Sequence, residues 1–224
     1  MPPQQSIYTD YIAAAVLFNL QILPESLLTG SILLALTTAN PVTLAMTVGG
    51  LVTQLLTDVI GRLLLRAMVG SDGSGGRHGS SLDTCSSGFG GKSWLRLLSP
   101  EPYWHPSAPS IYMATIGYFA GYGFALQQLY KEEIRAGIMS SATLTATAVL
   151  SVLILLTALL FRVASGCESV LGAIGGLSIG VLIGYLGTVA LGYATDRRAT
   201  NIWGIPLLRD RINDGAPVYV CDAE

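Results

Sequence analysis

The stretch VLGAIGGLSIGVLIGYLGTVALGY, residues 170–193, decides the fold of this chain. It is apolar throughout, and a small residue recurs at every fourth position: Gly172, Gly176, Gly180, Gly184, Thr188 and Gly192. In a helix this spacing places all of them on one narrow face, where another backbone can approach closely. Such a helix would be weak in water, because each glycine costs about 1 kcal/mol relative to Ala. In a bilayer the same face favours close helix packing, so the stretch predicts a membrane span packed against a partner helix.

The composition of the whole chain indicates several such spans. Of its 224 residues, 51% are hydrophobic and only 12% are charged, and the mean hydropathy is +0.55. An ordinary soluble domain has about 25% charged residues. We therefore predict an all-α polytopic membrane protein whose spans contact the lipid bilayer. The 12 basic and 14 acidic residues form no basic face, which argues against a nucleic-acid partner.

Apolar windows predict about five transmembrane helices. The first covers about 11–39 and contains Pro24, so it is either one kinked helix or an interfacial helix followed by a new one; we favour the kinked span. Asn40 and Pro41 suit a helix cap and a first helical turn, and they predict a tight hairpin to a second span over about 41–61. The other spans are expected at about 111–130, 142–161 and 170–193, with Arg162 ending the fourth. The chain thus divides into an N-terminal hairpin (1–69), a loop (70–110), a three-helix region (111–193) and a polar tail (194–224).

The loop and the tail are expected outside the bilayer. The loop 70–110 begins with a Gly/Ser-rich segment and continues with aromatic residues that favour the membrane interface: Trp94, Tyr103 and Trp104. In the tail 194–224, the sequence Asn-Asp-Gly at 213–215 separates two mixed segments and predicts a short β-hairpin. A two-stranded hairpin is marginal alone, so we expect the tail to dock on a neighbouring protein.

A second stripe of small residues occurs in the span over 111–130. It consists of Gly117, Gly121 and Ala125, again four residues apart. This stripe could receive the stripe of 170–193 within one chain, or the stripes could form a seam between copies in a homo-oligomer. The spacing alone leaves both arrangements open.

Charged residues in or near the spans are few. Asp58 and Arg62 lie four residues apart, which allows an ion pair on one helix face. An intramembrane carboxylate can indicate an ion or proton site, but an arginine one turn away favours an interfacial ion pair. The Lys and Arg residues divide equally between the two sides of the predicted bundle, so the positive-inside rule does not orient the chain. One side carries Arg62, Arg66, Arg77, Lys92, Arg96 and Arg162, and the other carries Lys131, Arg135, Arg197, Arg198, Arg209 and Arg211.

No motif predicts a catalytic, cofactor or metal site, so we predict that the chain is not an enzyme. Residues 176–180 match the G-x-S-x-G string of serine hydrolases, but a membrane span lacks the strand-to-helix turn that this chemistry needs. Ser178 is therefore interpreted as a small packing residue or a hydrogen-bonding residue between helices. The three cysteines have neither zinc nor disulfide-framework spacing, so they are interpreted as free thiols: Cys85, Cys167 and Cys221. Chain order would still place Cys85 and Cys167 on the same side of the membrane.

Three pieces of the chain stand out together: Leu23-Pro-Glu-Ser-Leu-Leu-Thr-Gly-Ser with Asn40-Pro41, Pro109-Ser-Ile-Tyr-Met-Ala-Thr-Ile-Gly-Tyr, and Gly204-Ile-Pro-Leu-Leu with Asp214-Gly-Ala-Pro-Val-Tyr-Val-Cys221. They resemble multi-span membrane proteins of large double-stranded DNA viruses of eukaryotes, the chlorovirus-like group, which include minor capsid components in the inner membrane beneath the outer shell.

This resemblance implies a structural role and transfers no catalytic residue. It implies spans anchored in a virion's internal, host-derived membrane, with the loop 70–110 and the tail 194–224 contacting capsid or membrane proteins. The alternative is a channel or transporter-like protein with glycine-packed helices, a class that uses broken helices such as the one expected near Pro24.

Overall fold

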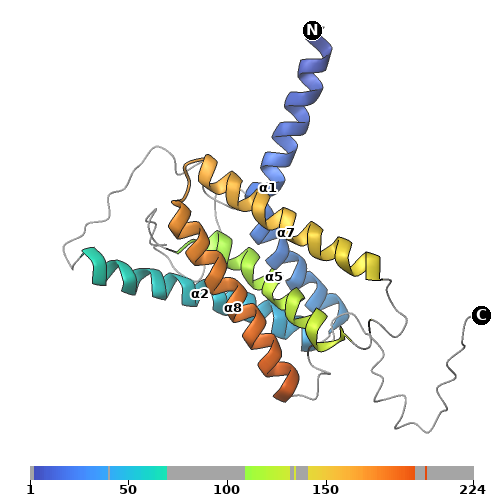
Figure 1. The fold of residues 1–224 in the computed structure, drawn as a ribbon, viewed down its shortest axis with the longest axis vertical. Coiled ribbons are helices and arrows are strands. Elements are labelled where there is room, and N and C mark those ends of the chain that lie inside the picture. Colours follow the sequence, from blue (N-terminus) through green and yellow to red (C-terminus); the bar gives the residue numbers. More distant parts are fainter. Residues whose placement is uncertain are drawn as a thin grey trace, which may run out of the picture.

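The computed structural model describes residues 3–39, 41–69, 109–131, 134, 141–194 and 200. Within these ranges the chain is almost entirely helical and contains no strand (Figure 1). Its long helices are α1 (Pro3–Thr38), α2 (Pro41–Val69), α5 (Ile111–Leu129), α7 (Ser141–Ala164) and α8 (Val170–Ala194). The predicted all-α polytopic membrane fold is confirmed. The β-hairpin expected in the tail lies outside the described residues.

Among the described residues, four helices are long and apolar enough to cross a membrane: Phe18–Thr38 in α1, Pro41–Leu64 in α2, Thr145–Ala164 in α7 and Val170–Ala194 in α8. α5 does not reach the same hydropathy, although the sequence predicts a span over 111–130. It lies at the centre of the bundle (Figure 1). Most of its side chains are buried. Because its neighbours shield α5 from lipid, it can carry tyrosine, threonine and glycine where a lipid-facing helix would carry leucine.

The helix α1 continues without interruption through Pro24, so the alternative of two separate helices is wrong. It also begins at Pro3, earlier than predicted, and its 36 residues correspond to about 54 Å of helix. The hydrocarbon core of a bilayer is only about 30 Å thick. The first turns of α1 therefore extend as an arm beyond the other helices, as Figure 1 shows.

α1 and α2 form a helical hairpin where the sequence predicts one. α1 ends at Thr38 and α2 begins at Pro41, with Ala39 between them in the left-handed region at φ 47°. Deeper in the pair, Leu28 packs beside Gly50, so the two helices run in opposite directions.

α5 and α8 make the most extensive contact between two helices. Three glycines of α8 lie so close to main-chain carbonyl oxygens of α5 that an added Cβ would overlap them, in the pairs Gly176 and Ser110, Gly180 and Ala114, and Gly184 and Tyr118. Two glycines of α5 lie in the same way against α8, in the pairs Gly117 and Leu177, and Gly121 and Val181. Residue numbers rise together in every pair, so the two helices are parallel. The stripes of α5 and α8 therefore meet within one chain, and we call this contact the α5–α8 seam.

The remaining small residues extend the seam toward both ends of α8. The carbonyl oxygen of Gly172 accepts a hydrogen bond of 2.9 Å from the Ser110 N–H. Thr188 is buried and its hydroxyl donates to the carbonyl of Gly184, while Gly192 lies against the side chain of Leu129. Ala125 of α5 is fully buried.

We predict that Gly180→Leu lowers the free energy of unfolding by about 3 kcal/mol or more, because overpacking must separate two main chains. The matched control is Gly187→Leu, since no atom lies within 4 Å of a Cβ added at Gly187. That change should leave stability unaltered or raise it by up to about 1 kcal/mol, because Leu favours a helix more than Gly does. Thermal unfolding in detergent, followed by circular dichroism, measures both effects. Equal losses in the two variants would contradict the importance of the seam.

Candidate functional site: the buried polar network of α5

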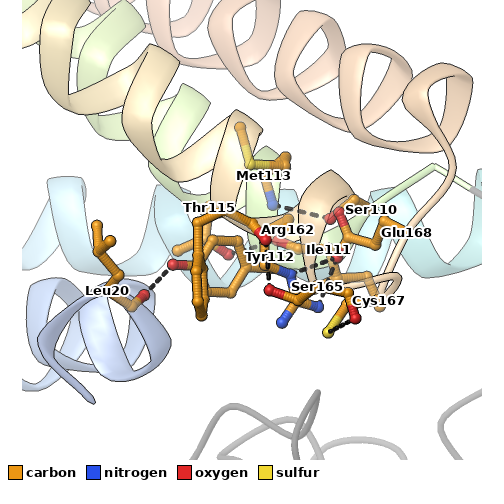
Figure 2. A network of polar contacts seen from close by, with 11 residues as sticks. Leu20, Ser110, Ile111, Tyr112, Met113, Thr115, Arg162, Ser165, Cys167 and Glu168 are labelled. Carbon is orange, nitrogen blue, oxygen red and sulfur yellow. Dashed lines mark hydrogen bonds and ion pairs between the residues drawn. The ribbon is translucent and has the colours of Figure 1, made fainter. Parts of the chain in front are cut away.

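A proline inside α1 leaves one main-chain carbonyl without its usual helical partner. Pro24 has no N–H, so the carbonyl oxygen of Leu20, four residues earlier, receives no hydrogen bond from the helix. The hydroxyl of Tyr112, in the first turn of α5, donates a hydrogen bond to that oxygen (Figure 2). Tyr112 thus satisfies the carbonyl that Pro24 frees, and it ties α5 to α1 at the proline.

The ring of Tyr112 lies against a buried ion pair at the end of α7. The guanidinium carbon of Arg162 is 4.4 Å from the ring centroid, within the range of a cation–π contact. Arg162 donates from Nη2 at 2.7 Å and from Nε at 3.0 Å to Oε1 of Glu168. The two side chains are only 3% and 8% exposed. Two charges withdrawn from water in this way require each other, because either one alone would be strongly destabilising.

The turn between α7 and α8 places Glu168 beside Arg162. Gly166 adopts φ 68°, and its N–H donates to the carbonyl of Val163 at 3.0 Å. The N–H of Cys167 donates to the carbonyl of Arg162 at 3.1 Å. This pair of bonds is the Schellman arrangement, which ends a helix at a left-handed glycine. α7 therefore continues to Ala164, two residues beyond the predicted end at Arg162, and Arg162 lies inside the bundle.

Cys167 is 1% exposed and disulfide-bonded, so the expectation of three free thiols is wrong. Its sulfur lies 3.9 Å from the carbonyl oxygen of Ser165, at the edge of the network in Figure 2. The other two cysteines of the chain, Cys85 and Cys221, fall outside the described residues.

Further polar contacts bind α5 to α2. Nε2 of Gln54 donates to Oγ1 of Thr115 at 3.0 Å, and Thr115 donates in turn to the carbonyl of Ile111 at 2.9 Å. One turn further along α5, the hydroxyl of Tyr118 donates to the carbonyl of Met46 at 2.9 Å. The contact of Gln54 is buried and that of Tyr118 partly buried, so both fix α2 against α5 with little competition from water.

Both ends of α5 are anchored by hydrogen bonds. At the start, Oγ of Ser110 accepts from the N–H of Met113 at 3.0 Å and caps the helix. At the other end, the hydroxyls of Tyr130 and Thr200 are 3.0 Å apart, and the Tyr122 hydroxyl donates to the Thr200 carbonyl at 3.4 Å. α5 is thereby tied to Thr200, six residues beyond the end of α8, as well as to the helices around it.

The other predicted residues have different outcomes. Nη2 of Arg62 lies 2.9 Å from Oδ2 of Asp58, so these two residues do form an ion pair. Ser178 is exposed on α8, so the interpretation of this residue as packed between helices is wrong. The predicted interface aromatics lie outside the described residues: Trp94, Tyr103 and Trp104.

Comparison with known proteins assigns the chain to no family. No family model, curated protein or solved structure matches the chain. In the part of the chain that the structure describes, no three His, Cys, Asp or Glu residues are grouped so as to hold a metal ion. What the described network does physically is to hold helices in place.

The sequence interpretation missed the contacts of Tyr112 and the ion pair of Arg162 with Glu168. Each had a signal. A proline within a long apolar helix frees a carbonyl that must find a donor on another helix. An arginine at the end of a span requires a carboxylate, and Glu168 is the next acidic residue along the chain. Their separation of six residues is not a helical pairing distance, and only the turn at Gly166 brings the two together.

We predict that Tyr112→Phe lowers the free energy of unfolding by about 1–3 kcal/mol, since it leaves the Leu20 carbonyl buried without a donor. Tyr118→Phe is the matched control. It removes a similar hydroxyl, but the Met46 carbonyl lies in an uninterrupted helix and keeps its intrahelical donor, so the loss should be smaller. In a Pro24→Ala background the main-chain donor to Leu20 returns, and Tyr112→Phe should then cost about 1 kcal/mol less than in the native background. Chemical unfolding of the four combinations in detergent measures the coupling, and additive effects would contradict the assignment.

We predict that Glu168→Gln destabilises the bundle by about 3–5 kcal/mol, because the Arg162 charge would remain buried without a partner. Replacing both residues by methionine should cost less than the single change, since no uncompensated charge is left. Unfolding midpoints in detergent for the single and double variants measure the difference. A double variant less stable than Glu168→Gln would show that the pair is not coupled in this way.

Proposed function

We propose that this protein is a structural integral-membrane protein that anchors a large assembly. Guided by the sequence resemblance, we further propose that it links the internal membrane of a virion to neighbouring capsid proteins. The loop 70–110 and the tail 194–224 are the proposed contact segments, together with the N-terminal arm of α1.

The observation that carries the proposal is that α5 is fastened to every other described helix. It is joined to α1 through Tyr112, to α2 through Thr115 and Tyr118, and to α7 through the stacked Arg162. It is joined to α8 along the seam. A helix held by its neighbours at so many points is suited to a fixed frame, whereas a transporter needs helices that can move against one another.

The outer surface of the bundle suits permanent residence in lipid. Large apolar side chains on α2, α7 and α8 are exposed, among them Leu63, Leu150, Leu160, Leu171 and Leu186. Lipid tails can cover such a surface, which would be unfavourable in water. The first turns of α1 precede the candidate span Phe18–Thr38 and extend the frame beyond it.

One buried residue favours the alternative of a channel or transporter-like protein. Glu25 is 4% exposed and lies within the candidate span Phe18–Thr38. The antiparallel pairing of Leu28 with Gly50 places Glu25 at about the height of Gln54 on α2. A carboxylate beside a helix-breaking proline inside a membrane is a common element of ion pathways.

Two measurements separate these functions. In assembled particles, a photo-crosslinking residue at position 8, 94 or 213 should capture neighbouring proteins, and the same residue at the lipid-facing position 160 should capture none. In liposomes, the purified protein should give no selective ion flux. A selective flux that Glu25→Gln abolishes would overturn the anchor in favour of the channel, and an absence of crosslinks from all three segments would also contradict the anchor.

A further inference from the structure

The packing contacts determine which segments meet at each end of the bundle. α1, α5 and α8 run in one direction. α8 is parallel to α5 along the seam. α5 is antiparallel to α2, because Met46 meets Tyr118 whereas the later residue Gln54 meets the earlier residue Thr115. α1 is antiparallel to α2 in their hairpin, and Leu20 and Gly172 both lie at the start of α5. α2 runs in the opposite direction, and α7 does so too, because its last turn meets the first turn of α5. We call the end that holds Leu20, Ser110 and the α7–α8 turn the Cys167 end. The opposite end, which holds the α1–α2 turn and the end of α8, is called the Ala39 end.

We propose that the Cys167 end faces an oxidising compartment, that Cys85 is the disulfide partner of Cys167, and that the Ala39 end faces the reducing cytosol. The first observation is the disulfide of Cys167 itself. Disulfides persist in secretory, periplasmic and extracellular compartments and are rare where glutathione and thioredoxin keep thiols reduced. A bonded cysteine at one end of the bundle therefore orients the whole chain.

Chain order selects the partner of Cys167. α2 ends and α5 begins at the Cys167 end, so the segment between them, which includes Cys85, starts and finishes there. α8 ends at the other side of the membrane, and Cys221 follows it. To reach Cys167, the segment after α8 would have to pass through hydrocarbon, where an unpaired main chain leaves its N–H and C=O groups unsatisfied. Cys85 is thus the partner that requires no crossing.

Charge is a second, independent observation. The sequence assigns six basic residues to each side, but two of those on the Cys167 side, Arg62 and Arg162, fall inside the candidate spans Pro41–Leu64 and Thr145–Ala164. The positive-inside rule counts basic residues in the segments that flank spans. Leaving out these two, 6 − 2 = 4 basic residues flank the Cys167 end, against 6 at the Ala39 end. The positive-inside rule then places the Ala39 end in the cytosol, in agreement with the disulfide.

Formation of the bond requires an oxidant of that compartment. The Sγ–H groups of Cys85 and Cys167 together lose two protons and two electrons as the Sγ–Sγ bond forms. A disulfide of a thiol oxidoreductase accepts both electrons and becomes a dithiol. The inference does not depend on the proposed function, because an anchor and a channel could both have this orientation.

The partner is tested by peptide mapping of the full-length protein. The protein is alkylated without reduction, digested and examined by mass spectrometry. We expect a reducible crosslink between the peptides of Cys85 and Cys167, retained in Cys221→Ser and lost in Cys85→Ser. A crosslink from Cys167 to Cys221, a crosslink between two copies of the chain, or alkylation of Cys167 in the native protein would each overturn the proposed pairing.

The orientation is tested by glycosylation mapping, since the native chain contains no Asn-x-Ser/Thr sequence. His78→Asn creates Asn-Gly-Ser at 78–80 in the loop, and Gly215→Thr creates Asn-Asp-Thr at 213–215 in the tail. In a eukaryotic cell we expect the first variant to gain a glycan that an endoglycosidase removes, and the second to remain unmodified. A glycan on the Gly215→Thr variant, or none on the His78→Asn variant, would overturn the orientation. The test is independent of the mapping because neither substitution changes a cysteine.

Discussion

The whole bundle depends on direct contact between two main chains, those of α5 and α8. Glycines on each helix leave no side chain between them, so the backbones approach as closely as sterics allow. Because lipid offers no hydrophobic drive for helix association, this close packing supplies the attraction between the two helices. Every other helix is then positioned relative to the pair, with α5 at the centre (Figure 1).

The second principle of the structure is that polar groups which their own helix cannot satisfy find partners elsewhere in the chain. The carbonyl freed by Pro24 is satisfied by Tyr112, and the charge of Arg162 by Glu168. In water such contacts would add little, because solvent competes for them. In a bilayer the unsatisfied alternative is costly, so each contact also specifies which helices are neighbours.

The sequence predicted the number, order and approximate bounds of the helices, because apolar runs of membrane length are a strong signal. It did not predict that α1 begins at Pro3, since residues before the apolar run carry no membrane pattern. The spacing of glycines predicted which faces are narrow, but it could not tell a contact within one chain from a contact between copies. The network around Tyr112 was not predicted, because its members are far apart in sequence and come together only after the helices pack.

The bond between Tyr112 and the Leu20 carbonyl has a consequence for biosynthesis. Helices of a membrane protein enter the bilayer in sequence order, and α1 precedes α5 by the whole of α2 and the segment 70–110. Until α5 is inserted, the Leu20 carbonyl has no donor, because Pro24 of its own helix lacks an N–H. The isolated α1–α2 hairpin therefore lacks this hydrogen bond, and the later insertion of α5 supplies it. Truncated chains that stop before residue 111 lack Tyr112, so their Leu20 carbonyl has neither a helical donor nor the donor from α5.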